Sequence, residues 1–455
     1  MADDGIRTEE QPAEQALAAF AIRGADHSIP PALDQPVPLT AAPAKAPIDA
    51  DDIELSLFGD LAAVELLWRA SEDQASRTFF QSFAWLQAWQ VHVGTRTGTS
   101  PVIIAGRHPD GTVVFILPLA VEHGRGLRRL TFLGADLCDY NAPLLHPAFS
   151  ALVDAGAFSV LWPRILAQLR SDPRFGFDVV DLPKMPERVG AQLNPLMGLA
   201  RQPNPSGAHL TSLGGSWEEF YARKRSAATR RTERKQLRQL GKVGEVHFVD
   251  QLEGEERVRT LDVLFEQKAH SFARMGVPNI FRRPGYTELF RSFATDPTCR
   301  HLVHLSRLEV GSSIAAASIG FTACSCYYLV LSSYDSGATA RLGPGRAHLQ
   351  ELLRFAIRSG IDVFDFTIGD ELYKLDWSDG RLTLYDHLSA ANLRGAVAVA
   401  LITGFRTLKR TIKQNAALWR LFSSSRSQLG AFRSGRIRAA SHADAVENTT
   451  GDLDA

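Results

Sequence analysis

The sequence predicts a mixed α/β (α+β) protein in which one arrangement of strands and helices occurs twice. In each half a hairpin-like pair of apolar strands precedes a helix and a buried strand, and the two copies are displaced by roughly 190–200 residues. The chain has 455 residues, more than one ordinary domain, and its 45% hydrophobic and 22% charged fractions are typical of a globular protein. We therefore expect mixed sheets flanked by helices.

The first copy begins with an aromatic segment. Residues 79–89 carry large apolar side chains at helical spacing, which predicts a helix with one face in the core. Residues 101–105 and 112–117 flank Pro109-Asp110-Gly111 and predict a hairpin. A helix at 161–169 and a strand at 177–182 complete this copy.

The second copy repeats this order. Strands at 302–308 and 314–321 flank a turn at Gly311, and a third strand covers 326–333. A helix at 347–358 has its apolar residues on one face, as packing on a sheet requires, and a strand follows at 361–366. Between the copies, residues 183–215 are rich in Pro, Asn and Gly, and we expect the interdomain connection there.

Composition narrows the classes of partner. Lys+Arg and Asp+Glu both total 50, so net charge favours no partner, and we expect no DNA. The four cysteines form neither a zinc nor a disulfide pattern, so we expect no metal, and Cys324 and Cys326 are interpreted as buried thiols. The acidic N-terminus lacks the features of a signal peptide, and the weakly polar stretch 395–405 is shorter than the roughly 20 residues of a membrane span. A cytoplasmic location is expected.

The two ends of the chain differ from its middle. Residues 1–50 are rich in Ala, Pro and acidic groups and are predicted to be disordered, as are the acidic residues 441–455. Residues 391–440 are basic and amphipathic and predict a helical region. Its segment 392–440 has two interpretations, which stay open: docking on a membrane surface, or packing on the catalytic domain.

The most informative segment runs from 341 to 374. A strand, the turn Gly343-Pro344-Gly345 and a helix N-terminus together predict an anion site, because the first N–H groups of a helix have no internal partner. Arg341 and Arg346 flank this turn. The P-loop pattern is absent, so nucleoside-triphosphate hydrolysis is not expected.

Groups suited to acyl transfer follow the turn. Asp365 lies within the predicted strand, where it is either a base or a structural partner of an arginine. Glu371 is a second candidate base, Tyr373 a proton donor, and Lys374 a cation that neutralises developing charge.

Residues 216–241 predict one strongly basic helix. Ser216 and Glu219 form a capping box, and Gly241 is suited to the end of the helix. The basic residues between 223 and 238, among them Arg230 and Arg231, are offset only by Glu233 in the middle stretch, which favours contact with a phosphate-bearing donor or another polyanion over a solvated face.

A further helical stretch places two polar residues four apart. His270 and Arg274 therefore share one helix face, where they are candidate contacts for the acceptor.

Together these features resemble a known family. Residues of about 210–390 are similar to the acetyltransferase domain of the cellulose-biosynthesis (CelD-type) proteins, a branch of the GNAT/FemAB-like superfamily. The resemblance is carried by the basic helix, the segments 264–276 and 334–349, and above all the block 364–374 followed by Trp377. The first half is similar to the N-terminal domain that accompanies the acetyltransferase domain in such proteins. This similarity is carried by Asp139-Tyr140-Asn141 and residues 143–145.

The resemblance implies tandem GNAT-like domains at 51–200 and 210–390. It implies transfer of an acyl group with acetyl-CoA as the donor. We expect the donor phosphates to be held by Arg341, Gly343, Gly345 and Arg346, and Lys374 to steady the acyl oxyanion or the acceptor phosphate. Pro344 departs from the family's pyrophosphate motif, where a glycine is usual.

The expected function is an N- or O-acetyltransferase acting on a sugar or cell-envelope or exopolysaccharide precursor. Two alternatives stay open. One is a non-catalytic component of a polysaccharide-synthesis assembly, and the other is an aminoacyl-tRNA-dependent transferase like the FemAB relatives.

Overall fold

The computed structural model describes residues 48–124, 126–134, 137–154 and 156–414. Residues 48–399 lie in one compact unit that contains both large sheets. The predicted disordered tails, 1–50 and 441–455, fall outside the described residues except for Ile48–Ala50. These three are ordered, since Ile48 bridges Val153 and Ala50 begins a short helical turn.

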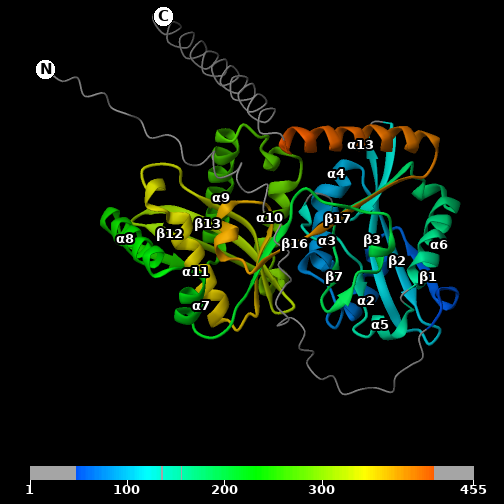
Figure 1. Cartoon of the computed structure of the whole chain (residues 1–455), viewed down its shortest axis with the longest axis horizontal. Coiled ribbons are helices and arrows are strands. Elements are labelled where there is room, and N and C mark those ends of the chain that lie inside the picture. The colour runs from blue at the N-terminus through cyan, green and yellow to red at the C-terminus, as the bar shows by residue number, and fades with distance from the viewer. Residues whose placement is uncertain (1–47, 125, 135–136, 155, 415–455) are drawn as a thin grey trace, which may run out of the picture. The chain divides into compact units, whose positions relative to one another are not determined.

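The first half builds an eight-stranded sheet (Figure 1). The strand order is β1-β2-β3-β4-β6-β17-β9, with β5 beside β3, and β4 and β6 are parallel. The elements of this half are β1 (Glu54–Phe58), α2 (Leu61–Glu72), α3 (Phe83–Trp89), α4 (Thr95–Thr97), β2 (Ser100–Arg107), β3 (Val113–Gly124), β4 (Leu127–Phe132), β5 (Leu144–Leu145), α5 (Phe149–Leu152), α6 (Ala157–Ser171), β6 (Val179–Pro186), β7 (Arg188–Val189), β8 (Gln192–Leu193) and β9 (Gln202–Pro203).

The second half builds a seven-stranded sheet in the order β11-β12-β13-β14-β15-β10-β16. Here β14 and β15 are the parallel pair. Its elements are β10 (Ala208–Ser212), α7 (Trp217–Lys224), α8 (Ala227–Val243), β11 (Val246–Val249), α9 (Gly254–Arg274), α10 (Tyr286–Thr295), β12 (Val303–Val310), β13 (Ser313–Ala323), β14 (Cys326–Tyr334), α11 (Pro344–Arg358), β15 (Val363–Ile368), α12 (Leu372–Trp377) and β16 (Gly380–Leu382), followed by β17 (Leu384–Ala390) and α13 (Leu393–Gln414).

The two halves therefore repeat one order: a strand, two main helices, a three-stranded meander, a helix and a strand parallel to the last one of the meander. This confirms the duplication and the α/β fold class. The chain crosses between the sheets twice, because β10 pairs with β15 whereas β17 returns to pair with β6. The domain division at 51–200 and 210–390 stays a prediction, with β17 lying in the first sheet.

The aromatic segment 79–89 joins the two halves. Its large rings are buried, as the periodicity predicts, and they pack on residues of the second sheet and α10. The ring of Phe79 stacks on that of Phe321 with centroids 4.1 Å apart, and Trp85 meets Phe293 edge to face at 5.3 Å. Buried aromatic pairs of this kind contribute about 0.5–1.5 kcal/mol each beyond their burial, so this contact holds the halves together.

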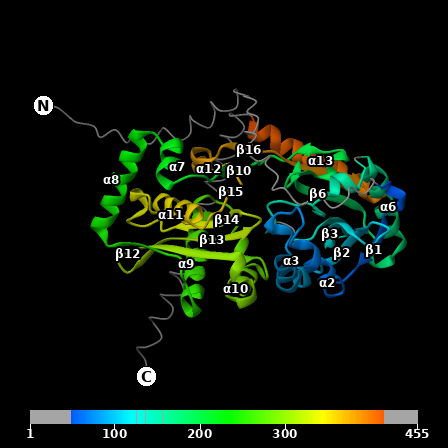
Figure 2. The same cartoon turned by 90° about the horizontal axis from the view of Figure 1, so that it is seen from below.

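Helices cover both faces of the second sheet. α9 packs on β13 and β14, and α11 packs on the same strands, with α8 against α11 (Figure 2). Leu349, Leu352 and Leu353 of α11 are buried against the sheet, which confirms the predicted apolar face.

The predicted basic helix 216–241 is in fact two helices. Arg225 has extended backbone angles and ends α7, and the Ser226 side chain caps α8 by accepting from the Thr229 N–H at 3.1 Å. The Ser216–Glu219 capping box is confirmed, but α8 continues past Gly241 to Val243. A serine that satisfies orphan N–H groups can start a new helix within a charged run, which composition does not reveal.

The thiols differ from expectation. Cys138 and Cys299 are buried, whereas Cys326 is half-buried and Cys324 is exposed. Cys324 has a φ of 51° in the turn between β13 and β14, and a turn of this kind carries its side chain out of the sheet.

The C-terminal basic region is described only as far as residue 414. Within it, α13 exposes Leu393, Val397, Leu401 and Phe405, spaced four apart. In the described residues no helix is long and apolar enough to cross a membrane.

Candidate functional site

The carboxyl end of β15 carries a buried carboxylate beside a strained residue. The Asp365 side chain is buried, and Thr367 adopts a φ of 60°, where a β-branched residue is an outlier. The strain coincides with a bulge in the pairing of β15 with β10. It is held by two bonds: the Thr367 N–H donates to the Asp365 carboxylate at 2.7 Å, and its hydroxyl donates to the Leu329 carbonyl at 3.2 Å. Strain retained in this way is typical of functional sites.

The first half of the chain supplies the partner of this carboxylate. The Tyr140 hydroxyl donates to Asp365, with both carboxylate oxygens 2.8 Å away. Burial raises the pKa of Asp365 to about 7, although the bonds from Tyr140 and Thr367 oppose this rise. Burial also raises the pKa of Asp139 next to it, against the opposing charge of Lys184. Both halves therefore contribute to one polar cluster.

The residues after β15 add a cation and an exposed carboxylate. The Lys374 side chain is 4% exposed, and its ammonium group donates to the Ile368 carbonyl at 2.8 Å and lies 3.0 Å from the Glu371 carboxylate. Glu371 itself is largely exposed, with 59% of its side chain accessible. Tyr373 is 36% exposed, and burial of its hydroxyl, beside Ser332, raises its pKa. The predicted residues Asp365, Glu371, Tyr373 and Lys374 thus lie at one end of β15.

The cluster lies where β14 leaves β15. Parallel pairing joins only three residue pairs, from Cys326 with Val363 to Tyr328 with Asp365, although β14 continues to Tyr334. In the described part of the chain, the remainder of β14 has no strand partner on that side. Beyond Leu329, whose carbonyl accepts from Thr367, the backbone groups of β14 on that side have no strand partner among the described residues and could bind an extended ligand.

The Gly-Pro-Gly turn forms the N-terminus of α11, as predicted. Gly343 has a φ of 71°, which favours glycine, and precedes Pro344 at the first helical position. A side chain at Gly345 would meet the Tyr334 ring at 3.0 Å, so this position also requires a small residue. The Arg346 guanidinium donates to the Gln236 side chain of α8 at 2.8 Å, and Arg341 is exposed nearby.

The remaining predicted contacts lie on other elements. His270 and Arg274 are exposed near the end of α9, and among the described residues neither makes a side-chain hydrogen bond or ion pair. Arg230 of α8 approaches the Tyr221 ring at 5.9 Å, whereas Arg231 is exposed. The structure therefore brings the four predicted catalytic residues together but does not join these acceptor and donor candidates to them.

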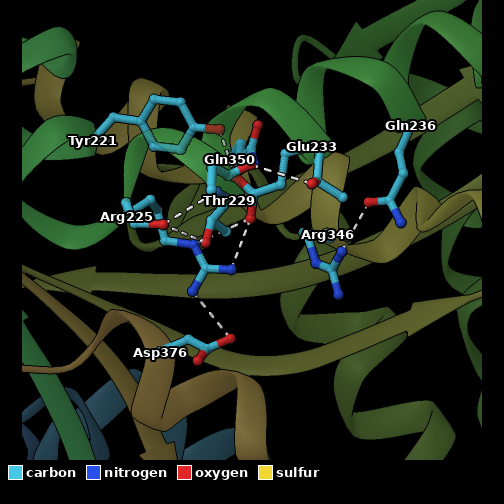
Figure 3. A network of polar contacts seen from close by, with 11 residues as sticks. Tyr221, Arg225, Thr229, Glu233, Gln236, Arg346, Gln350 and Asp376 are labelled. Atoms are coloured by element: carbon cyan, nitrogen blue, oxygen red, sulfur yellow. Dashed lines mark hydrogen bonds and ion pairs between the residues drawn. The ribbon is translucent and has the colours of Figure 1, made fainter.

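α7 and α8 are held together by one buried carboxylate (Figure 3). Glu233 accepts from the Arg225 guanidinium at 2.8 Å and from the Gln350 amide at 3.0 Å, and the Tyr221 hydroxyl also donates to it. Arg225 lies 3.1 Å from Asp376 of α12 as well. Glu233 thus bonds to side chains outside α8 and does not offset the basic residues of its own helix.

Sequence reasoning did not select several members of the cluster. Asp139 and Tyr140 entered only through the family resemblance, and Lys184 and Thr367 were not selected. One signal was available: Asp178-Val-Val-Asp181 at β6 matches Asp362-Val-Phe-Asp365 at β15, and each copy is followed by a non-glycine residue with positive φ. Aligning the copies directs attention to the ends of both strands.

A histidine was also missed. His209 of β10 is 1% exposed, and neither ring nitrogen has a hydrogen-bond partner in the described part of the chain. Burial, reinforced by the charge of Lys374, lowers its pKa, so the ring is neutral near pH 7. In the same described residues, no group of three His, Cys, Asp or Glu side chains is arranged to hold a metal ion.

Comparisons with known proteins place part of this arrangement in a family. Residues 227–375 match the model of the family described as acetyltransferase (GNAT) domain. The match begins at α8 and ends in α12, so it includes the Gly-Pro-Gly turn and the end of β15. No curated protein matches the chain.

Solved structures resemble most of the chain at low identity. FemX is 10% identical, with a TM-score of 0.49, and covers 74% of this chain and 97% of its own. L-PGS from Bacillus licheniformis is 11% identical, with a TM-score of 0.43 and coverage of 76% and 96%. A tandem GNAT protein from the clavulanic acid biosynthesis pathway is 14% identical, with a TM-score of 0.40 and coverage of 75% and 99%.

The family match supports the expected chemistry at a coarse level. GNAT domains use acyl-CoA as the donor, and the matched segment holds the turn and the four residues to which this chemistry was assigned. Residues 227–375 therefore match a GNAT-type acetyltransferase domain, and the protein is an acyltransferase.

Proposed function

We propose that the protein transfers an acetyl group from acetyl-CoA to an amine or hydroxyl of a sugar or cell-envelope precursor, as a CelD-type enzyme of the cytoplasm. The observation that supports the proposal most is the polar cluster at the end of β15. Tyr140, from the first half of the chain, donates to Asp365 there, so both halves line the site. A site shared by two halves is buried enough to strengthen electrostatic interactions with the reacting groups.

Exposure divides the roles among the candidate residues. The two oxygens of Asp365 are engaged by Tyr140 and Thr367, so Asp365 positions the cluster. Glu371 has the accessible carboxylate and is the general base. Lys374 donates to backbone carbonyls and to Glu371, so it orients that base, and steadying the oxyanion remains its alternative role.

The transfer step is a nucleophilic substitution at the thioester. The acceptor nitrogen or oxygen attacks the acetyl carbonyl carbon, a new C–N or C–O bond forms, and the C–S bond breaks. Glu371 takes the proton from the acceptor. Tyr373, whose phenol is protonated at neutral pH, gives a proton to the departing thiolate.

The donor phosphates bind at the Gly-Pro-Gly turn. The N-terminus of the 15-residue α11 has its positive end there, and Arg341 and Arg346 add two cations. From this turn the donor extends along the unpaired part of β14 toward Glu371.

Transfer assays with a panel of amino sugars test this proposal. Glu371→Gln is expected to lower kcat by about 10²–10⁴-fold while acetyl-CoA binding is retained, because only proton transfer is removed. Asp370→Asn, which neutralises the adjacent exposed carboxylate, is the matched control. Equal turnover of Glu371→Gln and the control would show that Glu371 is not the base.

A second donor is favoured by one observation. Arg231, Lys235 and Arg238 are exposed on α8, a density of charge suited to a nucleic-acid backbone. Under this alternative the donor is an aminoacyl-tRNA. Calorimetric titration separates the two donors: heat with acetyl-CoA supports the first, and heat only with aminoacyl-tRNA supports the second.

A further inference from the structure

We propose that a pocket between α7, α8 and α11 binds the terminal phosphate on the ribose of the nucleotide donor, the 3′-phosphate of coenzyme A. This inference rests on the proposed function and names a contact that the Gly-Pro-Gly turn does not provide. The pocket has a volume of about 230 Å³, which is ample for a phosphate group. Its lining includes Trp217, Tyr221, Arg230, Glu233, Arg234 and Arg354.

Three arginines give the pocket its charge. Arg230 and Arg234 make no ion pair within the described residues, and the Nε of Arg230 is buried without a hydrogen-bond partner. A buried donor without a partner is destabilising, so an acceptor that enters the pocket and bonds to it is favoured. Arg354 lies over the Trp217 ring at 4.8 Å and pairs with Glu351 at 2.6 Å.

The carboxylates of the pocket do not cancel this charge. Glu233 is already neutralised by Arg225, which is not in the lining, and its oxygens also accept from Tyr221 and Gln350. Glu218 is exposed in the first turn of α7. The network in Figure 3 therefore fixes the wall of the pocket and leaves Arg230 and Arg234 available to an anion, whereas Arg354 is shared with Glu351.

Aromatic rings in the pocket support a phosphate rather than a base. Trp217 stacks on Tyr221 with centroids 4.9 Å apart, and Arg354 lies over the Trp217 ring. Both rings are thus engaged with neighbours, whereas the guanidinium of Arg230 has a buried donor without a hydrogen-bond partner in the described residues.

The pocket lies within reach of the turn. Gln236 of α8 contacts Arg346, which lies beside the Gly-Pro-Gly turn. On α8, Arg230 and Arg234 precede Gln236 by less than two turns of the helix. Along α11, Gln350 follows Gly345 by five residues, or about 7.5 Å of helix rise. That span suits a nucleotide whose diphosphate lies at the helix N-terminus and whose ribose phosphate lies in the pocket.

Coenzyme A and dephospho-coenzyme A, which lacks only the 3′-phosphate, provide the test. The intact protein is expected to bind coenzyme A at least about tenfold more tightly, the effect of a charge-assisted hydrogen bond or two. Arg230→Gln and Arg354→Gln should each remove most of this difference while dephospho-coenzyme A binds as before. Arg358→Gln, one turn beyond Arg354 on α11 and exposed, removes the same charge outside the pocket and should preserve the difference.

Calorimetry on the full chain measures each affinity, and thermal unfolding checks that each variant is folded. Equal affinity of the intact protein for the two compounds would overturn this inference while leaving the proposed function in place. An equal loss of discrimination in Arg358→Gln would also overturn it. The preference for coenzyme A would then come from the overall positive charge of this region and not from contacts in the pocket. Binding of neither compound would overturn the donor assignment itself.

Discussion

The buried carboxylate of Asp365 makes stability depend on pH in a way that one substitution removes. Its folded-state pKa is about 7, raised from the ordinary value of 3.8 by burial. Because the folded protein disfavours the charged form, the stabilisation by the neutral acid is complete below about pH 4 and is lost as pH rises to 7. A difference of about three units at 1.36 kcal/mol each corresponds to about 4 kcal/mol, most of which develops between pH 5 and pH 8.

Asp365→Asn keeps the shape of the side chain and removes the titration. Relative to the unsubstituted protein, the free energy of unfolding of this variant should therefore rise by about 2–3 kcal/mol between pH 5 and pH 8. The bond from the Tyr140 hydroxyl can still be accepted by the amide oxygen, so the cluster is retained. Groups that titrate alike in both proteins cancel in this difference.

Urea unfolding at pH 5, 6, 7 and 8 measures the effect. Asp362→Asn is the matched control, because Asp362 precedes Asp365 in the same segment and is exposed. Its stability should follow that of the unsubstituted protein at every pH. A constant gap between Asp365→Asn and the unsubstituted protein from pH 5 to pH 8 would refute the assignment of a neutral buried acid.

Four further outcomes are expected. Gly343→Ala should weaken acetyl-CoA binding and cost about 1 kcal/mol of stability, since its φ of 71° disfavours a side chain; unchanged calorimetry would contradict this. Glu233→Gln should cost about 3–5 kcal/mol in urea unfolding because it leaves Arg225 without its buried partner, and a loss below 1 kcal/mol would argue against that pairing. Trp377→Ala should cost about 3–5 kcal/mol by opening a cavity in a site that is 1% exposed, measured in the same way. Leu401→Asp should abolish sedimentation with anionic vesicles at low salt if α13 docks on membranes, and no binding by the unsubstituted protein would rule out the membrane-docking interpretation.

Sequence pattern alone determined the order of elements and the chemistry-bearing segment. Apolar periodicity is a local property, so β12, β13, β14, α11 and β15 could be predicted within a few residues. The Gly-Pro-Gly turn could also be predicted from local sequence, because Gly343 adopts a backbone conformation that few other residues favour. The grouping of Asp365, Glu371, Tyr373 and Lys374 followed from their closeness along the chain.

Tertiary structure alone decided which distant residues complete the site. Tyr140 and Asp365 are 225 positions apart, and their contact depends on how two sheets pack through the aromatic segment 79–89. The return of β17 to the first sheet depends on pairing between strands, which no local pattern records. Burial, which sets the pKa of Asp365 and decides which arginines of α8 face a pocket, is likewise a property of the packed molecule.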